Sequence, residues 1–294
     1  MKRLAINLFC LLWATTLFAA MNTDTVENVT GLTGSWNERE HLFKVSKPRT
    51  DVKVTVDGWV MPPFMGLTSW AAFTEGHGGD AMVMGDLVLF QDEVNPVMSA
   101  ALNNGLAVTA LHNHFFYEEP KVYFMHIGGE GSVSNLAVGV RRCFDAVKEI
   151  RAANPTPATR FGPPTPATNS ITVRDLEKLL GVTGQENNGM FKVVIGRKAT
   201  MHGTEIGKEI GVNTWAAFAG TDDNAVVDGD FAVQEDELQP ILKILRRANI
   251  NIVAIHSHMT HETPRIHFLH YWGRGQAELL AKSIKTALDT QEGP

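Results

Sequence analysis

The sequence predicts an α+β protein made of two tandem homologous domains, each a mainly antiparallel sheet with two helices, related by a pseudo-twofold axis. Three observations lead to this prediction: an internal repeat, short strand-like segments separated by glycines, and two helical segments in each half. The repeat places His256 144 residues after His112. A period of this length is the size of a domain and not of a solenoid unit.

Residues 1–20 form a separate unit. Two basic residues precede an apolar run over residues 4–18, and two alanines follow it. This pattern is typical of a secretory signal peptide, and the run is too short for a transmembrane helix. We therefore expect a secreted or periplasmic protein with no stable membrane span after signal removal. Because Cys10 lies inside the apolar run, we expect no lipid anchor.

Composition limits the classes of protein that the chain can belong to. Without the signal peptide, Cys143 is the only cysteine, which excludes an intramolecular disulfide. Hydrophobic residues make up 44% and charged residues 20%, as in globular proteins that fold around apolar cores. The formal net charge is -6 and no Lys/Arg cluster occurs, so we expect no nucleic-acid partner.

The domain boundaries follow from the repeat and from proline content. The first repeat domain covers residues 21–150 and the second covers residues 170–294. Between them, residues 151–169 contain five prolines and little apolar periodicity, which predicts a semi-rigid, extended linker. The tetrapeptide W-A-A-F at residues 70–73 returns unchanged at residues 215–218.

Apolar alternation with glycine punctuation predicts the strands of the first domain. The second domain repeats the pattern. The expected strands of the first domain cover residues 43–45, 52–56, 69–73, 81–89, 107–114 and 121–127.

Two helices are expected in each domain. The first begins at Asp92, a favourable N-cap, and ends at Asn104, which precedes a glycine. Asp236 and Asn249 mark the same two ends in the second domain. An amphipathic helix closes each domain. The closing helices cover residues 133–150 and 276–288.

One histidine pattern occurs in both domains with identical spacing. It reads H-x-H-x3-E-x-P-x5-H-x2-G-x-G and begins at His112 and at His256. Side chains two residues apart on a strand leave the same face about 6–7 Å apart. The first two histidines of each copy can therefore share one cation at about 2.0–2.1 Å per nitrogen. The third histidine arrives on the next strand. The predicted metal ligands are His112, His114, His126, His256, His258 and His270.

A glutamate four residues after the second histidine can fold back toward the same point. Glu118 and Glu262 are therefore the candidate catalytic residues, as an oxygen ligand or a general base. Three nitrogens and one oxygen suit a divalent Zn, Mn, Fe or Cu ion, and the spacing does not choose among them. In a simple hairpin, His126 would lie opposite about residue 109, so it needs a β-bulge or crossed strands to reach the cation.

Other residues are assigned different roles. Asp86 and Asp230 each follow a glycine, so we expect them in turns, with a carboxylate that faces the site as the alternative. Trp70 and Trp215 are expected in the core. Two further histidines occur only in the second domain and either add to its site or lie outside it. They are His261 and His267.

The repeated segments W-A-A-F, G-D before a D-E helix start, and H-x-H…E-x-P…H resemble the LppY/LpqO family of bacterial exported proteins. The resemblance covers nearly all of the chain after the signal peptide. It implies a secreted or envelope protein of unassigned function and carries over no catalytic residue. The H-x-H-x3-E element is also similar to the first cupin motif. Because the second cupin motif is missing and a helix precedes the strand, we expect no cupin barrel.

Three functions remain open. A metal-dependent enzyme, in particular a hydrolase, would use the ion to lower the pKa of water while Glu118 or Glu262 moves protons. A non-catalytic envelope module would bind a metal ion or a small-molecule ligand. A structural duplicate would hold hydrogen-bonded histidines and no metal.

Overall fold

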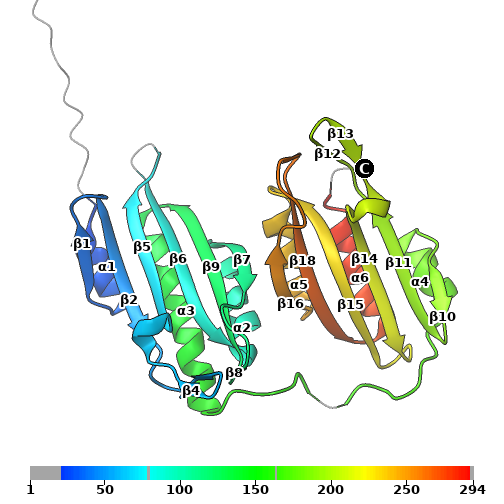
Figure 1. Ribbon diagram of the computed structural model, residues 1–294, viewed down its shortest axis with the longest axis horizontal. Coiled ribbons are helices and arrows are strands. Elements are labelled where there is room, and N and C mark those ends of the chain that lie inside the picture. The colour runs from blue at the N-terminus through cyan, green and yellow to red at the C-terminus, as the bar shows by residue number, and fades with distance from the viewer. Residues whose placement is uncertain (1–20, 78–79, 163, 292–294) are drawn as a thin grey trace, which may run out of the picture.

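The computed structural model describes residues 21–77, 80–162 and 164–291 (Figure 1). The predicted signal peptide, residues 1–20, lies outside the described residues. The chain folds into two repeated halves of mixed α+β structure with mostly antiparallel sheet, so the predicted fold class is confirmed.

One twelve-stranded sheet runs through both halves. The first-half order β1-β2-β5-β6-β9-β7 is followed by the mirrored order β16-β18-β15-β14-β11-β10. A pseudo-twofold axis between β7 and β16 produces this palindrome. The strands in that order are β1 (Gly34–Asn37), β2 (Leu42–Pro48), β5 (Thr68–Glu75), β6 (Ala81–Phe90), β9 (Val122–Gly131), β7 (Ala107–His112), β16 (Asn251–His256), β18 (Ile266–Gly275), β15 (Ala225–Gln234), β14 (Asn213–Gly220), β11 (Met190–Gly196) and β10 (Gln185–Asn187).

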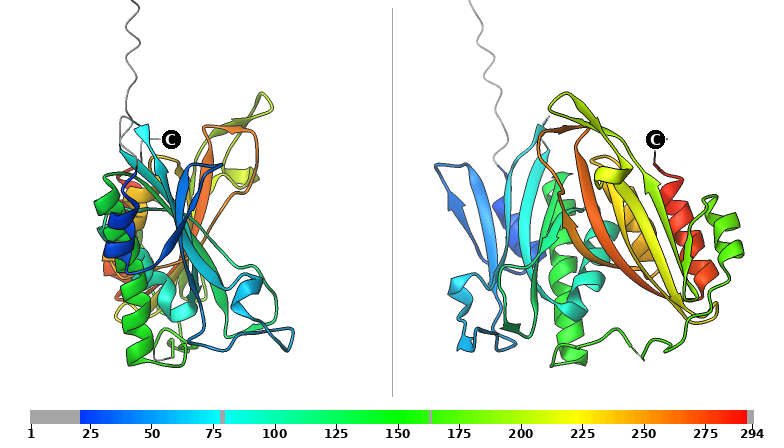
Figure 2. Two further views of the ribbon diagram at one scale, coloured as in Figure 1. Left: turned by 90° about the vertical axis from the view of Figure 1, so that its left-hand side faces the viewer. Right: turned by 45° about the vertical axis from the view of Figure 1, so that its right-hand side comes forward.

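Helices from both halves cover one face of the sheet (Figure 2). Along β5 and β6 every second residue is buried under them, among them Phe73 and Val83, and one apolar cluster extends through both halves. The described residues of each half contain three α-helices, one more than expected. The helices are α1 (Thr23–Thr30), α2 (Gln91–Asn103), α3 (Val133–Ala153), α4 (Val173–Leu180), α5 (Leu238–Arg247) and α6 (Ala277–Leu288). No described helix combines the length and apolarity needed to cross a bilayer.

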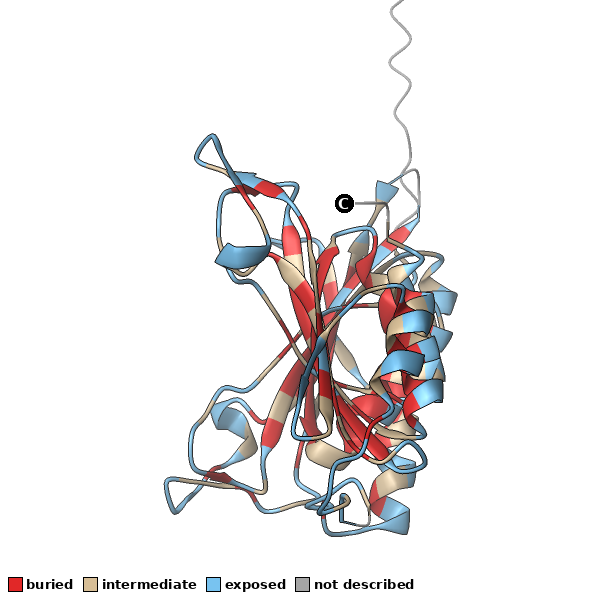
Figure 3. Ribbon diagram, turned by 90° about the vertical axis from the view of Figure 1, so that its right-hand side faces the viewer, coloured by how far each residue is buried: buried red, intermediate tan, exposed pale blue. Residues whose placement is uncertain are grey.

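Two small layers stand on the opposite face, which we call the open face. They project from opposite ends of the sheet, one in each half (Figure 3). Each buries a small apolar cluster against the main sheet, around Phe90 and Phe124 in the first half and around Val212 and Phe268 in the second. The layers consist of β3 (Thr55–Val56), β4 (Trp59–Val60), β8 (Glu118–Glu119) and the 3-10 helix η1 (Pro63–Met65), and of β12 (Ala199–Met201), β13 (Thr204–Ile206), β17 (Glu262–Thr263) and the 3-10 helix η3 (Lys208–Ile210).

The halves meet where β7 pairs with β16, at Leu111 opposite Ile255. We call this line the seam. Two amide side chains cross it. The Asn95 side chain of α2 accepts from the Ile252 backbone N–H at 2.7 Å and donates to the Ile252 carbonyl at 3.1 Å. The Gln239 side chain of α5 makes the same pair of bonds with Val108, at 2.9 and 2.8 Å.

The expectation that the two tryptophans of the repeated W-A-A-F segments lie in the core is wrong. Trp70 and Trp215 are half-exposed on the open face, where Lys44 lies 4.2 Å above the Trp70 ring and Lys192 lies 4.3 Å above the Trp215 ring. The strand alternation puts the phenylalanine of each W-A-A-F segment in the core instead.

Asp92 is not the N-cap of α2. The cap is Phe90, whose backbone N–H donates to the Glu93 carboxylate at 2.8 Å, so Glu93 supplies the capping interaction. Asp92 lies in the first turn of the helix, where its charge still suits the helix dipole.

Candidate metal centres

In the second half, three neighbouring strands present polar side chains to one point on the open face. Asp230 on β15 lies opposite His270 on β18, and His270 lies opposite Ala254 on β16. His256 follows two residues later on β16. Opposed residues in antiparallel strands share a face, as do residues two apart. His258, in the loop after β16, completes the cluster.

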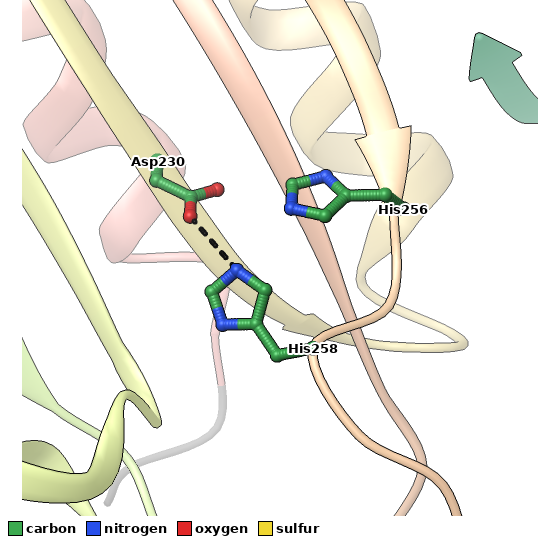
Figure 4. Close-up of side chains that lie close together, drawn as sticks. All are labelled: Asp230, His256 and His258. Atoms are coloured by element: carbon green, nitrogen blue, oxygen red, sulfur yellow. Dashed lines mark ion pairs between the residues drawn. The ribbon is translucent and has the colours of Figure 1, made fainter.

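The side chains of this cluster lie close enough together to bind one cation after small movements. The ring of His256 lies 5.0 Å from the ring of His258 and 4.9 Å from that of His270, between centroids. The His258 Nε2 atom lies 3.5 Å from the Asp230 carboxylate (Figure 4). Ligating atoms of Asp230, His256 and His258 all lie within 4.8 Å of one another. Bonds of about 2.0–2.2 Å place two donors of a tetrahedral ion about 3.4 Å apart. Small side-chain rotations therefore suffice.

The first half repeats the arrangement. Asp86 on β6 lies opposite His126 on β9. The His112 ring lies 5.1 Å from the His114 ring and 5.2 Å from the His126 ring, between centroids. Among the described residues, only the second-half cluster has three ligating atoms within 4.8 Å of one another, so the second half is the more compact of the two.

A β-bulge aims the histidines, as the sequence argument required for His126. Val108 lies opposite Ile127, but Ala110 and not Thr109 lies opposite His126. Without this shift His112 would face Tyr123 and point toward the helix layer, since a one-residue slip reverses every side chain. With the shift His112 lies opposite Phe124 and shares the open face with His126. The second half has the same bulge between Ile252 and Ala254.

Two neighbours contact the ring nitrogens of His258. Its Nδ1 atom lies 3.2 Å from the Gly211 carbonyl oxygen, and its Nε2 atom faces the Asp230 carboxylate. A metal ion bound to Nε2 would leave Nδ1 to donate to the carbonyl and so to orient the ring.

Asp86 and Asp230 are the carboxylates among the rings, and their expected place in turns is wrong. Both lie within long strands. The preceding glycine serves close packing between strands and not a turn, because a Cβ on Gly229 would lie 2.1 Å from the Tyr271 hydroxyl oxygen. The signal that could have identified Asp86 was its position in the predicted strand over residues 81–89, where it shares the parity of the exposed Met84.

Glu118 and Glu262 lie in β8 and β17, at the base of the small layers. Both are buried, and one Glu262 oxygen accepts a hydrogen bond from the Ile266 backbone N–H at 3.2 Å. No hydrogen bond or ion pair between described residues joins either glutamate to an imidazole. The structure therefore brings the six predicted histidines into two clusters with Asp86 and Asp230, and places the glutamates in the small layers, on β8 and β17.

The clusters contain buried polar atoms that lack a hydrogen-bond partner. Burial raises the pKa of Asp230, although His270 and His258 oppose this rise. Burial and the neighbouring imidazoles lower the pKa of His256, and burial and His112 lower the pKa of His114. These two rings thus favour the neutral form, which is the form that binds metal. The buried atoms without a partner in and beside the clusters are Asp86 Oδ1, Glu118 Oε2, Asp230 Oδ1, His256 Nδ1 and Glu262 Oε2.

The two histidines found only in the second half lie outside its cluster. His267 is on β18 but has the opposite parity to His270, so it faces the helix layer. His261 lies in the loop before β17, with its ring 5.8 Å from that of His202.

The fold and the clusters define a class of protein: a duplicated α+β chain with one His/Asp cluster in each repeat. A family model described as a Domain of Unknown Function (DUF1259) matches residues 24–146 and 174–290. Because these two matches cover most of the chain, the protein belongs to this family, and the family domain occurs in it twice. Searches of curated proteins and of solved structures found no match.

Proposed function

We propose that the protein binds one divalent transition-metal ion in each half. The observation that carries this proposal is the convergence of three imidazoles on the buried Asp230 carboxylate, which has an unpartnered oxygen, and the repeat of the same residue set around the half-buried Asp86. The ligands of the first ion are Asp86, His112, His114 and His126. The ligands of the second ion are Asp230, His256, His258 and His270.

The orphaned atoms favour a metal over a structural role. A buried polar atom without a partner costs about 1–3 kcal/mol, and hydrogen-bonded structural histidines would not leave several such atoms together. A cation would satisfy the carboxylate oxygens and the neutral imidazoles at once. Three nitrogens and one oxygen accept Zn, Mn, Fe or Cu, with affinity rising toward Cu in the usual order of divalent ions.

The open face also supports a reaction at the metal, and hydrolysis is the reaction class we propose. His258 and His270 are half-exposed, so a water molecule can reach a bound ion. Such an ion lowers the pKa of its water toward about 7. Glu118 and Glu262 would move protons after approaching the ion. A non-catalytic module that captures a metal ion or small molecule is the alternative, because it needs the same ligands without proton transfer.

Elemental analysis of protein purified without chelator tests the metal site. We expect about two equivalents per chain, and about one in H112A/H114A or in H256A/H258A. The matched control H202A/H261A removes two exposed histidines outside the clusters and should retain both. Less than about a tenth of an equivalent, with none taken up on titration, leaves only the structural duplicate.

We further propose that the protein is exported after removal of residues 1–20, as an LppY/LpqO-type protein. The basic start, the apolar run over residues 4–18 and the repeated motifs support this proposal. N-terminal sequencing of the protein from an envelope or secreted fraction should begin near residue 21. Full-length protein in the cytoplasm would contradict export.

A further inference from the structure

We infer that the two metal centres serve one elongated ligand that carries an anionic group at each end and lies across the seam. The inference rests on the proposed metal binding and adds the ligand class. It follows from where the seam places the two clusters.

The seam joins the clusters on one surface. Because Leu111 and Ile255 are paired and both face the helix layer, His112 and His256 both face the open side. His112 then lies opposite Ala254, two residues from His256. Such diagonal neighbours are about 7–8 Å apart. No strand separates the two histidines.

Six consecutive strands carry the two clusters. In sheet order these strands are β6, β9, β7, β16, β18 and β15, and they contribute one Asp, four His and one Asp. The centre of each cluster lies over β9 or β18, which are three strand spacings apart. At about 4.8 Å per spacing, with a diagonal offset, the two ions would be roughly 15 Å apart. A ligand that contacts both ions must span this distance.

Two small side chains lie on the open face between the clusters. Ala110 lies opposite His126, and Ala254 lies opposite His270. Both alanines face the open side and are partly exposed. The surface between the ions therefore alternates alanine methyl groups with the rings of His112 and His256, and an apolar chain can lie on it.

The outer end of each cluster is basic. Trp70 lies opposite Asp86, and Trp215 lies opposite Asp230. Each tryptophan holds a lysine ammonium over its ring, Lys44 in the first half and Lys192 in the second. Two dications with two ammonium groups outside them favour an anion at each end, although the exposed Asp228 lies on the same face. Carboxylate and phosphate groups can fill an open metal position.

Calorimetric titration of zinc-loaded protein with dodecanedioate and with its monoamide tests the inference. Zinc content is measured first. We expect the diacid to bind one per chain, about a hundredfold more tightly than the monoamide, because its second carboxylate binds intramolecularly. The monoamide should bind two per chain.

Two variants separate the ligand from the metal. A110L/A254L adds bulk between the centres and replaces no metal ligand. Because these alanines lie opposite His126 and His270, the zinc content of the variant is measured first; with two zinc ions bound, it should lose the advantage of the diacid. The control A72L adds a leucine elsewhere on the open face. It should keep both the two zinc ions and the tighter binding of the diacid.

Equal affinity for diacid and monoamide, or two diacids per chain, overturns the inference and leaves the metal proposal standing. An unchanged advantage in A110L/A254L also overturns it. Failure to take up zinc overturns both proposals.

Discussion

At the scale of the residue, ring stacking fixes one histidine of each cluster. The His114 ring lies 3.3 Å from the Phe124 ring and the His258 ring lies 3.4 Å from the Phe268 ring, between centroids and nearly parallel. Each phenylalanine belongs to the apolar cluster of a small layer. The apolar clusters of the small layers therefore help to orient His114 and His258, which are proposed metal ligands.

The lowered pKa values of His114 and His256 predict a pH-dependent stability of the metal-free protein. The unfolded chain takes up protons on these residues near pH 6.5, whereas burial keeps the folded residues neutral to lower pH. The free energy of unfolding should therefore fall as the pH falls below about 6.5. Melting temperatures in chelator between pH 7.5 and 5 measure this fall. It should be smaller in H114A/H256A and unchanged in the control H261A.

Cys143 should be unreactive in the native protein. It is fully buried, and burial raises the pKa of its thiol to about 12. Because the thiolate is the reactive form, a thiol reagent should not label the native protein that lacks residues 1–20, and should label one site per such chain in denaturant. Rapid labelling of native protein would show that helix α3 opens easily.

The histidines of the two clusters could be predicted from the sequence, but their carboxylate could not. The repeated spacing identified the histidines, although His114 and His258 lie in the loops just after β7 and β16 and not on the strands. The partner of His126 lies forty residues earlier in the chain, at Asp86. Only the register between β6 and β9 brings them together. A glycine that permits close strand packing was interpreted as part of a turn.

At the scale of the element, a buried ion-pair network holds the start of helix α2. Glu93 is fully buried and bonds to Arg49 at 2.7 Å and to Arg151 at 2.9 Å. In the second half Glu237 bonds to Arg197 at 2.8 Å, and Gln291 takes the place of the second arginine. The first half therefore buries two guanidinium groups beside Glu93, and Asp51 and Asp92 form further ion pairs with them.

Replacing Glu93 with Gln should destabilise the protein, because Arg49 and Arg151 lose a buried counter-charge and keep only the more exposed Asp51 and Asp92. Glu237→Gln should cost more, about 3–5 kcal/mol, since Glu237 is the one carboxylate among the described residues that pairs with Arg197. Chemical denaturation measures both. The control Glu278→Gln breaks an exposed pair with Lys282 and should change stability by less than about 1 kcal/mol. Equal costs for the two buried variants would contradict the argument.

Long elements were predictable and short ones were not. Strands β5 and β6 and helix α3 carry enough alternation or amphipathic periodicity to be recognised. Helix α1 buries only Val26 and Thr30, so its sequence has no clear apolar stripe. It depends on Asn22 at its start, on Gly31 in the left-handed conformation at its end, and on packing against α3.

At the scale of the whole molecule, each half stabilises the bulge of the other. Asn95 belongs to the first half and satisfies both backbone groups of Ile252, beside the second-half bulge. Gln239 does the same for Val108, beside the first-half bulge. These bulges aim His256 and His112. Loss of either amide leaves buried backbone groups unpaired, at about 1–3 kcal/mol.

Because each amide bonds to the backbone of the other half, its loss should affect the proposed metal centre of that other half. In protein whose first centre is removed by H112A/H114A, N95A should weaken zinc binding roughly tenfold, as loss of an orienting partner does. Q239A should leave that affinity unchanged. In H256A/H258A protein the two effects should exchange. Competition titration with a zinc-binding dye measures the affinities, and equal effects of both amides in each background would contradict the crossing.

The duplication and its pseudo-twofold symmetry were predictable, because the internal sequence repeat indicates them directly. The continuous sheet was not. The halves are joined by the residue pair Leu111 with Ile255, by two side-chain amides, by a hydrogen bond from Arg246 to Ser99 and by the shared apolar cluster. Pairing between strand edges that lie far apart in the chain leaves no local pattern.

The crossing amides have a consequence for chains that carry only one copy of this unit. Asn95 and Gln239 occupy equivalent places, as do Val108 and Ile252, so the contact surface of one half is complementary to itself. In a one-copy relative, the strand that corresponds to β7 or β16 would have an unpaired edge. The side chain that corresponds to Asn95 or Gln239 would lack its hydrogen-bond partners. Two such chains could bury both by assembling as a true twofold dimer. On this view the present protein is a dimer made permanent by gene fusion.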